Sequence, residues 1–331
     1  MQTGVMQQLT VRHVLTRSLS ANTRLAYEKG WRRFASFCEQ TGRKAMEATG
    51  EDVAQFLVQT ASRPRSRRAT TGGDRPVSLG TLQISLSAIN RRYKDAGRES
   101  PGHAAVVAAV VHGLTRIRGT GQRRVKAIRE GELRKMLTCC DRRSGDGRFR
   151  GAATRDAALL AIGFAGALRR SEICQLNVED VEFVGGADGG AGLLLTIRRS
   201  KTDQAANGQR IAIPEGKKIR AVARLRKWLA LARTTKGPLF QSLWRGGRLR
   251  GRRLHHSDIP RLVKHYVQAI GLDPAEYSGH SLRAGFVTSA AVHGARLDKI
   301  MEVTRHRSAE MVLRYIRQVE AFEDHAGAAF L

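Results

Sequence analysis

The chain has 331 residues, enough for two domains with buried cores, and its hydrophobic content of 41% is ordinary for a globular protein. Its charge is not ordinary, because 58 Lys and Arg residues face 29 Asp and Glu residues and leave a formal net charge of +29. So much like charge disfavours a compact chain on its own and predicts a polyanionic partner, of which nucleic acid is the first candidate.

An anionic membrane is the competing partner, and the sequence argues against it. Residues 1–17 lack the continuous apolar stretch of a signal peptide, and the longest apolar run, 157–168, is too short to span a bilayer. The four cysteines form no CxxC pair, so free thiols in a reducing interior are expected. We therefore expect a soluble, cytoplasmic protein, associated with the nucleoid if the host is bacterial.

The first domain is predicted to be helical and to cover residues 20–115, after an N-terminal arm at 1–19. Ser20 can cap its first helix. One apolar face of that helix recurs at steps of four, three and four: Tyr27, Trp31, Phe34 and Cys38. Helices are expected at residues 20–40, 51–60, 79–96 and 103–117.

Two basic stretches interrupt this pattern. Residues 62–78 combine arginines with prolines and a glycine pair, which is typical of an exposed loop. Residues 116–129 contain no acidic residue and predict an interdomain linker that lies along a phosphate backbone, or otherwise a solvated charged loop. The expected DNA contacts are Arg24, Arg32, Arg33, Arg63, Arg65, Arg67, Arg68, Arg91, Arg92, Arg118, Arg123, Arg124, Lys126, Arg252 and Arg253.

The second domain is predicted to cover residues 130–331 and to be mainly α with a small antiparallel β-sheet. Strands are expected at residues 181–184, 193–198 and 210–213, the last two forming a hairpin around a polar loop. Residues 252–256 are interpreted as a basic loop. Helices are expected at residues 130–140, 154–168, 217–233, 258–270, 280–293, 297–302 and 308–320. An apolar stripe in the C-terminal tail, 319–331, is expected to pack on its own domain or on a neighbouring protomer.

Several short segments of this domain carry residues that could bind a phosphate. Glu172 follows Arg169 at i+3 and can fix its guanidinium toward a phosphate, although such a pair is more often a surface ion pair. Lys201 lies in the predicted hairpin loop, where a lysine is usually only solvated. His280 and Arg283 share one face near a helix N-terminus, which favours anions.

With His306 and Tyr315 the set resembles a known family. In order and spacing the chain is similar to the tyrosine recombinases, or phage-type integrases, at six positions: Arg169, Lys201, His280, Arg283, His306 and Tyr315. The match runs from Arg169 to Tyr315, and the helical first domain resembles the family's core-binding domain by pattern alone. The family commonly has Leu-Gly before the last histidine, whereas this chain has Thr304-Arg305. If that turn needs a positive φ, Arg305 would strain it, or Arg305 would contact a phosphate.

The resemblance implies a two-domain site-specific recombinase in which Tyr315 attacks DNA and forms a 3′-phosphotyrosyl intermediate. It further implies that Arg169 and Arg283 stabilise the transition state, and that Lys201 protonates the 5′-oxygen. His280 is implied to hydrogen-bond the phosphate and to be a candidate for accepting the Tyr315 proton. His306 is implied to donate to a non-bridging oxygen, and Glu172 to hold Arg169. Neither cofactor, metal nor ATP is expected, and the implied assembly is a homotetramer on two double-stranded DNA sites.

Other functions remain open. A type IB topoisomerase uses similar residues to relax DNA, a non-catalytic DNA-binding relative would have lost some of them, and a DNA-packing protein would not need Tyr315. Whether the task is integration, excision, resolution or mobile-element transfer is left open, because specificity depends on base contacts and DNA deformation.

Overall fold

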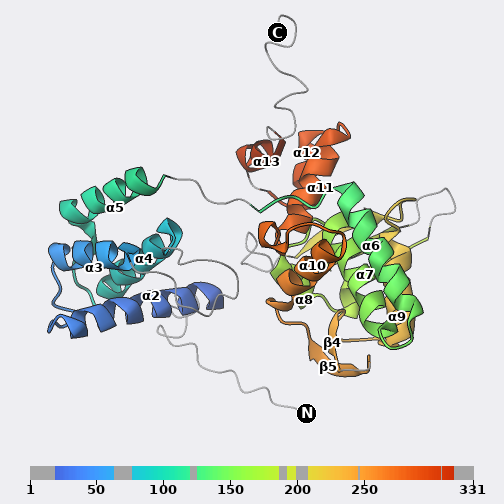
Figure 1. Ribbon diagram of the computed structural model, residues 1–331, viewed down its shortest axis with the longest axis horizontal. Coiled ribbons are helices and arrows are strands. Elements are labelled where there is room, and N and C mark those ends of the chain that lie inside the picture. The colour runs from blue at the N-terminus through green and yellow to red at the C-terminus, as the bar shows by residue number, and fades with distance from the viewer. Residues whose placement is uncertain are drawn as a thin grey trace, which may run out of the picture. The chain divides into compact units, whose positions relative to one another are not determined.

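The computed structural model describes residues 19–62, 77–119, 125–185, 192–198, 208–244, 247–306 and 308–316. The chain divides into two compact units, with the boundary between Arg123 and Arg124. Figure 1 shows the helices of the first unit and the mixed second unit. The second unit is mainly helical with two small antiparallel sheets, which confirms the predicted fold class. None of the described helices combines the length and apolar character needed to cross a bilayer.

The first unit contains four α-helices and one short 3-10 helix among its described residues: α2 (Ala21–Gln40), α3 (Gly50–Ser62), α4 (Leu79–Asp95), η1 (Pro101–His103) and α5 (Ala105–Arg118). Ser20 caps α2 as predicted, because its side chain accepts a hydrogen bond from the Thr23 amide at 3.2 Å. α2 packs on α4, and α3 packs on α5. Phe34 and Cys38 of the predicted apolar face are fully buried, whereas Trp31 is partly exposed at the edge of the same cluster.

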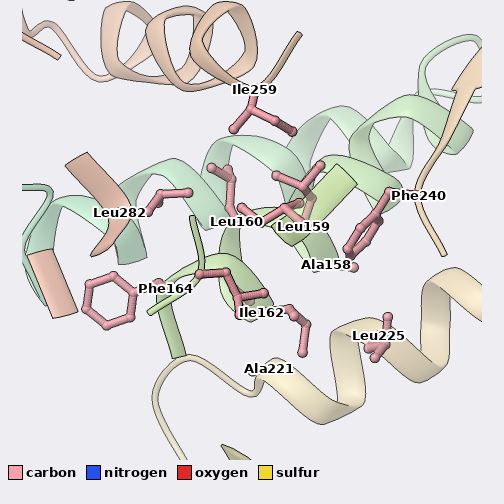
Figure 2. Packing of buried hydrophobic residues seen from close by; sticks show 14 of the residues in the cluster. Ala158, Leu159, Leu160, Ile162, Phe164, Ala221, Leu225, Phe240, Ile259 and Leu282 are labelled. Carbon is pink, nitrogen blue, oxygen red and sulfur yellow. The ribbon is translucent and has the colours of Figure 1, made fainter. Parts of the chain in front are cut away.

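The core of the second unit surrounds one apolar helix. It begins with α6 (Glu130–Gly145) and α7 (Arg150–Ala165), and α7 packs against both α6 and α9 (Ala221–Ala232). Figure 2 shows side chains of α7 pointing outward in several directions into this core, among them Leu160 and Phe164. A helix that is apolar on every side must be covered on every side, which is why the long apolar run of the sequence lies at the centre.

A three-stranded antiparallel sheet follows the short helices α8 (Arg170–Gln175) and η2 (Val178–Asp180). Its strands, in the order β1-β2-β3, are β1 (Val181–Val184), β2 (Gly192–Ile197) and β3 (Gln209–Pro214). β2 and β3 pair antiparallel from Gly192↔Pro214 to Ile197↔Gln209, which confirms the predicted hairpin.

A second hairpin, β4 (Gln241–Leu243) and β5 (Leu249–Arg253), was not predicted. The expectation of a loop at 252–256 is wrong at its start, because Arg252 and Arg253 belong to β5. Strand β5 has a single apolar residue and therefore lacks the alternation that marks a half-buried strand. Its pairing is set instead by the turn, in which the Trp244 amide donates to the Arg248 carbonyl at 2.9 Å.

The last part of the second unit is helical: α10 (Asp258–Ala269), η3 (Pro274–Glu276), α11 (Ser281–Val292), α12 (Leu297–Thr304) and α13 (Ala309–Ile316). α13 packs against α11 and α12 around the buried side chains of Val287, Ile300 and Val312. The tail that follows α13 lies outside the described residues, as does the N-terminal arm up to residue 18.

The predicted linker at 116–129 is only partly a linker. Its first three residues are the last turn of α5, which ends before Gly119 at a φ of +68°. Its last five residues are extended and bound to the second unit, because the Lys126 amide donates to the Glu276 carbonyl at 2.8 Å and the Ile128 amide to the Ser281 carbonyl at 3.0 Å. The entry to the second unit is thereby fastened to the start of α11.

Candidate active site

Arg169 is held by Glu172 in the turn between α7 and α8. Arg169 is the N-cap residue of α8, and the Glu172 carboxylate accepts its backbone amide at 2.9 Å and its Nη1 at 2.7 Å. Glu172 is buried, with a side-chain exposure of 1%. A carboxylate fixed in this way orients the guanidinium and leaves its other donors for a ligand. The pair is therefore not the surface ion pair that its spacing alone would suggest.

Arg283 lies inside the protein on the first turn of α11. It is 1% exposed, its Nη1 donates to the Ala167 carbonyl at 2.7 Å, and its Nη2 donates to the Thr304 carbonyl. Burial, with the positive charges of Arg169 and Arg305, lowers the pKa of Arg283. A guanidinium nevertheless stays protonated in proteins, so this side chain is a buried positive charge in need of an anion.

His280 and Tyr315 contact each other although 35 positions separate them. The His280 Nε2 and the Tyr315 hydroxyl oxygen are 2.8 Å apart, and they join the N-terminus of α11 to α13. Packing of protein around the imidazole, together with Arg283 and Arg169, lowers the pKa of His280. A neutral imidazole within hydrogen-bond reach of a hydroxyl is the arrangement that general-base catalysis requires.

His306 is 9% exposed and follows directly after the turn that ends α12. Its Nδ1 lies 2.8 Å from the Thr304 hydroxyl, which itself lies 2.7 Å from the Ile300 carbonyl and donates to it. Since that hydroxyl has a single proton, it accepts from the His306 Nδ1–H, and the neutral ring then has a bare Nε2. Burial and the charges of Arg283 and Arg169 lower the pKa of His306 to about 4.

Arg305 has a positive φ of 57°, so this turn does require the backbone conformation that glycine adopts freely. The alternative interpretation of Arg305, as a phosphate contact, does not fit its partners, because its charge is paired with Glu172 and both of its terminal nitrogens are bonded within the protein. Its side chain is 3% exposed and forms an ion pair of 2.8 Å with Glu172. Its Nη1 donates to the Val303 carbonyl at 2.8 Å and to the Gly166 carbonyl at 3.3 Å.

Lys201 lies outside the described residues. The strands on either side of it, β2 and β3, are paired up to Ile197 and Gln209, so the lysine belongs to the segment that connects this hairpin. The structure therefore brings together the other predicted site residues of the second unit: Arg169, Glu172, His280, Arg283, His306 and Tyr315.

Some of the expected DNA contacts have protein partners. Arg253 donates to the carbonyls of Cys174 and Leu176 and to the Asn177 side chain, at 3.0, 2.9 and 2.7 Å, and so fastens β5 to the end of α8. Arg118 donates to the carbonyls of Val77 and Ala61. These two side chains stabilise local structure, a role that sequence reasoning did not anticipate.

The remaining expected contacts differ in their surroundings. Arg91 pairs with Asp95 at 2.7 Å, Lys126 with Glu276 at 2.7 Å, and Arg92 lies over the Trp31 ring at 5.5 Å. Arg24 is partly exposed, and the exposed arginines among them are Arg32, Arg33, Arg92 and Arg252. The others lie outside the described residues: Arg63, Arg65, Arg67, Arg68, Arg123 and Arg124.

Two groups of the site were missed by sequence reasoning. Thr304 orients His306, and the Ala167 carbonyl accepts from Arg283 at 2.7 Å and lies 3.5 Å from the Arg305 Nη2. Ala167 has a positive φ of 46°, a backbone conformation rare for alanine. Only the departure at Thr304-Arg305 from the usual Leu-Gly could have drawn attention to this turn.

Comparison with known proteins shows to which family the chain belongs. The model of the phage integrase family matches residues 126–321. An integrase/recombinase XerD homologue of Selenomonas ruminantium is 34% identical over 320 residues, which cover 96% of this chain and 88% of that protein. The recombinase Cre of Escherichia phage P1 is 23% identical over 310 residues, covering 88% of this chain and 82% of Cre.

Two solved structures share the fold. The XerH site-specific recombinase bound to a palindromic difH substrate, in a post-cleavage complex, superposes with a TM-score of 0.66 at 16% identity, covering 95% of this chain and 81% of XerH. A lambda integrase dimer bound to a COC′ core site gives 0.58 at 16% identity, with 92% of both chains covered. From the family match and the identity to the XerD homologue, the chain belongs to the phage integrase family and is a tyrosine recombinase, an enzyme of site-specific DNA recombination.

Proposed function

We propose that Tyr315 is the nucleophile of strand cleavage and that His280 is its base. Tyr315 would form a bond from its hydroxyl oxygen to the phosphorus, and the bond from phosphorus to the 5′-oxygen would break. The contact of 2.8 Å between the His280 Nε2 and the Tyr315 hydroxyl is the observation that carries this assignment. The lowered pKa of His280 supports it, because a ring that is neutral near pH 7 can take the tyrosine proton.

Arg169 and Arg283 are proposed to stabilise the pentacovalent transition state. Negative charge collects on the two non-bridging oxygens of the phosphate, and preorganised cations stabilise it most in a site that excludes water. The hydrogen bonds of Arg283 to the Ala167 and Thr304 carbonyls leave part of its fork for the phosphate. His306, oriented by Thr304, would add a hydrogen bond to the phosphate once the phosphate charge has favoured its protonation.

Lys201 is proposed as the acid that protonates the departing 5′-oxygen. The lysine is placed by chain connectivity in the segment between β2 and β3. The reaction conserves the energy of the phosphodiester in the 3′-phosphotyrosyl bond, which a 5′-hydroxyl of a partner strand can attack in turn. No ATP is then needed, and the arginines supply the charge that a metal ion would supply in other phosphoryl-transfer enzymes.

The substrate is proposed to be double-stranded DNA, held by both units, with four protomers on two sites. The net charge of +29 and the exposed Arg32 and Arg33 of α2 support DNA binding. The XerH and lambda integrase structures that share the fold are described as DNA complexes, which supports the same proposal. The tetramer is supported by the family resemblance.

Tyr315→Phe tests the assignment of the nucleophile. The substitution removes one oxygen, so folding and DNA binding should persist while covalent attachment disappears. A DNA duplex nicked next to the cleavage point should trap wild-type protein as an adduct that survives denaturation, in EDTA and without ATP. An adduct formed by Tyr315→Phe in equal yield would show that another residue attacks, and loss of the wild-type adduct in EDTA would contradict independence from metal.

A further inference from the structure

Arg305 occupies a position that ought to be glycine. It caps α12 with left-handed backbone angles, φ 57° and ψ 41°, and its amide donates to the Met301 carbonyl at 2.7 Å. A side chain in this conformation costs free energy that glycine avoids. A strained residue persists where the surrounding contacts compensate for it, so the contacts of Arg305 indicate its purpose.

Arg233 shows what the same backbone geometry looks like without such contacts. It caps α9 in the left-handed conformation, φ 49° and ψ 34°, and its amide donates to the Leu229 carbonyl at 2.9 Å. The Arg233 side chain is exposed, whereas that of Arg305 is 3% exposed. The difference between the two arginines therefore lies in the side chain alone.

The buried side chain of Arg305 is engaged on the carboxylate that holds Arg169. Glu172 accepts Arg169 Nη1 on Oε1 at 2.7 Å, and on Oε2 it accepts Arg305 Nη2 at 2.8 Å and the Arg169 amide at 2.9 Å. Both oxygens are occupied, so the plane of the carboxylate is fixed from two sides. Rotation of Glu172 would displace the Arg169 fork.

Charge gives Arg305 a second effect on the same group. The three arginines 169, 283 and 305 against the one carboxylate of Glu172 give the cluster a net charge of 3 − 1 = +2. Without Arg305 the sum is 2 − 1 = +1, and Glu172 would neutralise Arg169 more completely. A site that must stabilise growing negative charge loses part of its field in that case.

We propose that Arg305 is a positioning residue for strand cleavage, which acts through Glu172 to hold Arg169 and keep its charge available to the phosphate. This inference rests on the proposed function, in which Arg169 meets the non-bridging oxygens. Arg305 also joins the turn before His306 to the turn before α8, because its Nη1 donates to the Gly166 carbonyl at 3.3 Å. Its role would be exerted through Glu172 and not through a contact with DNA, since its side chain is 3% exposed and paired within the protein.

The test compares Arg305→Gly with Arg233→Gly. Both substitutions relieve a left-handed arginine, but only the first removes the contact to Glu172. At saturating nicked DNA, Arg305→Gly should cleave on the order of 10- to 100-fold more slowly, as misplaced catalytic groups do, with the Kd for DNA within about twofold of wild type. Arg233→Gly should keep the wild-type cleavage rate. A cleavage rate of Arg305→Gly equal to that of Arg233→Gly would overturn the proposal, as would a loss confined to DNA affinity.

A methylphosphonate at the cleavage point provides a readout that a general loss of structure cannot imitate. The methyl group removes the negative charge that Arg169 is proposed to meet, so the defect of Arg305→Gly should shrink to a few-fold on this substrate, and so should that of Arg169→Ala. The ratio of the phosphodiester to the methylphosphonate cleavage rate, measured on one preparation of a variant, does not depend on how much of that protein is folded. An unchanged ratio relative to wild type contradicts a role through Arg169.

Two further measurements complete the test. If Arg305→Gly does not fold, Arg305→Lys is measured in its place, since lysine keeps the charge but not the fork. A cleavage rate between those of wild type and Arg169→Ala supports the proposal. A ratio of phosphodiester to methylphosphonate rates equal to that of wild type contradicts it. Absence of an adduct with wild-type protein, or its presence with Tyr315→Phe, would count against the proposed function. Wild-type behaviour of Arg305→Gly alongside a normal Tyr315 result would count against Arg305 alone.

Discussion

At the scale of single residues, the site is a set of buried charges that the free protein balances only in part. Arg283 and Arg305 are buried arginines, and Glu172 is the carboxylate between them and Arg169. Breaking a buried ion pair leaves an uncompensated charge, which is strongly unfavourable. In the proposed function a DNA phosphate supplies the missing negative charge, so the buried charges that are unfavourable in the free protein would favour binding of the phosphate.

His306 gives a prediction on the pH dependence of stability. Its pKa is about 4 in the folded protein and about 6.5 in the unfolded chain, so between these values the unfolded chain binds a proton that the native state excludes. The free energy of unfolding must then fall as the pH falls, by about 2 kcal/mol from this residue by pH 5. Above about pH 6.5 the effect is absent.

His306→Gln should therefore lose less stability than wild type between pH 7 and pH 5. Urea unfolding of both proteins at the two pH values measures the difference directly, and any change that the substitution makes at pH 7 cancels from the comparison. An equal loss of stability in the two proteins would contradict the buried, neutral state of His306.

At this scale the candidate site residues could be predicted from the sequence, but the contacts that hold them could not. Each of the six family positions has a chemically distinctive side chain at a characteristic interval, so Arg169 and Tyr315 could be recognised without coordinates. The support given by the Ala167 carbonyl could not, because its hydrogen bond joins Arg283 to a residue 116 positions away and leaves no periodic trace. The contact of Thr304 with His306, two positions apart, could not either, because a threonine beside a histidine is not a distinctive sequence pattern.

At the scale of elements, helices were predictable and the short strands less so. The starts of α2, α4, α6 and α10 were predicted to within one residue, because capping residues and apolar spacing mark them locally. The hairpin β4–β5 was missed, because β5 consists almost entirely of arginine and glycine and is defined by pairing rather than by its own pattern. The structure of residues 125–129, within the predicted linker, could not be read from the sequence for a similar reason, since backbone hydrogen bonds to η3 and α11 hold this segment.

Gly285 is the point at which α11 meets the extended segment at 125–129. A Cβ at this glycine would lie 1.7 Å from the Ile128 carbonyl oxygen, and the backbone of Ile128 is itself held by the hydrogen bond from its amide to the Ser281 carbonyl. Gly285→Ala should therefore destabilise the protein by about 1–3 kcal/mol, or more, and should displace the helix that carries Arg283.

Gly131→Ala is the matched control for this substitution. Gly131 also lies in a helix of the second unit, but a Cβ there would meet no atom within 4 Å, so alanine should stabilise α6 by up to about 1 kcal/mol. Urea or thermal unfolding distinguishes the two variants. Equal stabilities for Gly285→Ala and Gly131→Ala would mean that the segment does not lie against α11 in solution.

At the scale of the whole molecule, the dominant property is the net charge of +29 over 331 residues. Lys and Arg occur in both units, and the exposed Arg32 and Arg33 lie on α2 away from the buried face that includes Phe34. Binding that neutralises phosphates releases counterions, so affinity must fall as salt rises. The logarithm of the association constant should decrease with the logarithm of salt concentration by about 0.9 for every phosphate contacted.

Arg32→Ala combined with Arg33→Ala should make that slope shallower by up to about 1.8, twice the value for one contact, while weakening binding at low salt. Lys44→Ala is the control, because Lys44 is as exposed but pairs with Glu47 and is not an expected contact. Titration of a labelled duplex carrying one binding site, at four or more salt concentrations, gives the slopes for all three proteins. If the double variant and Lys44→Ala both have the wild-type slope, α2 does not face the DNA backbone. If the wild-type slope itself is near zero, the charge of the chain serves some purpose other than binding phosphates.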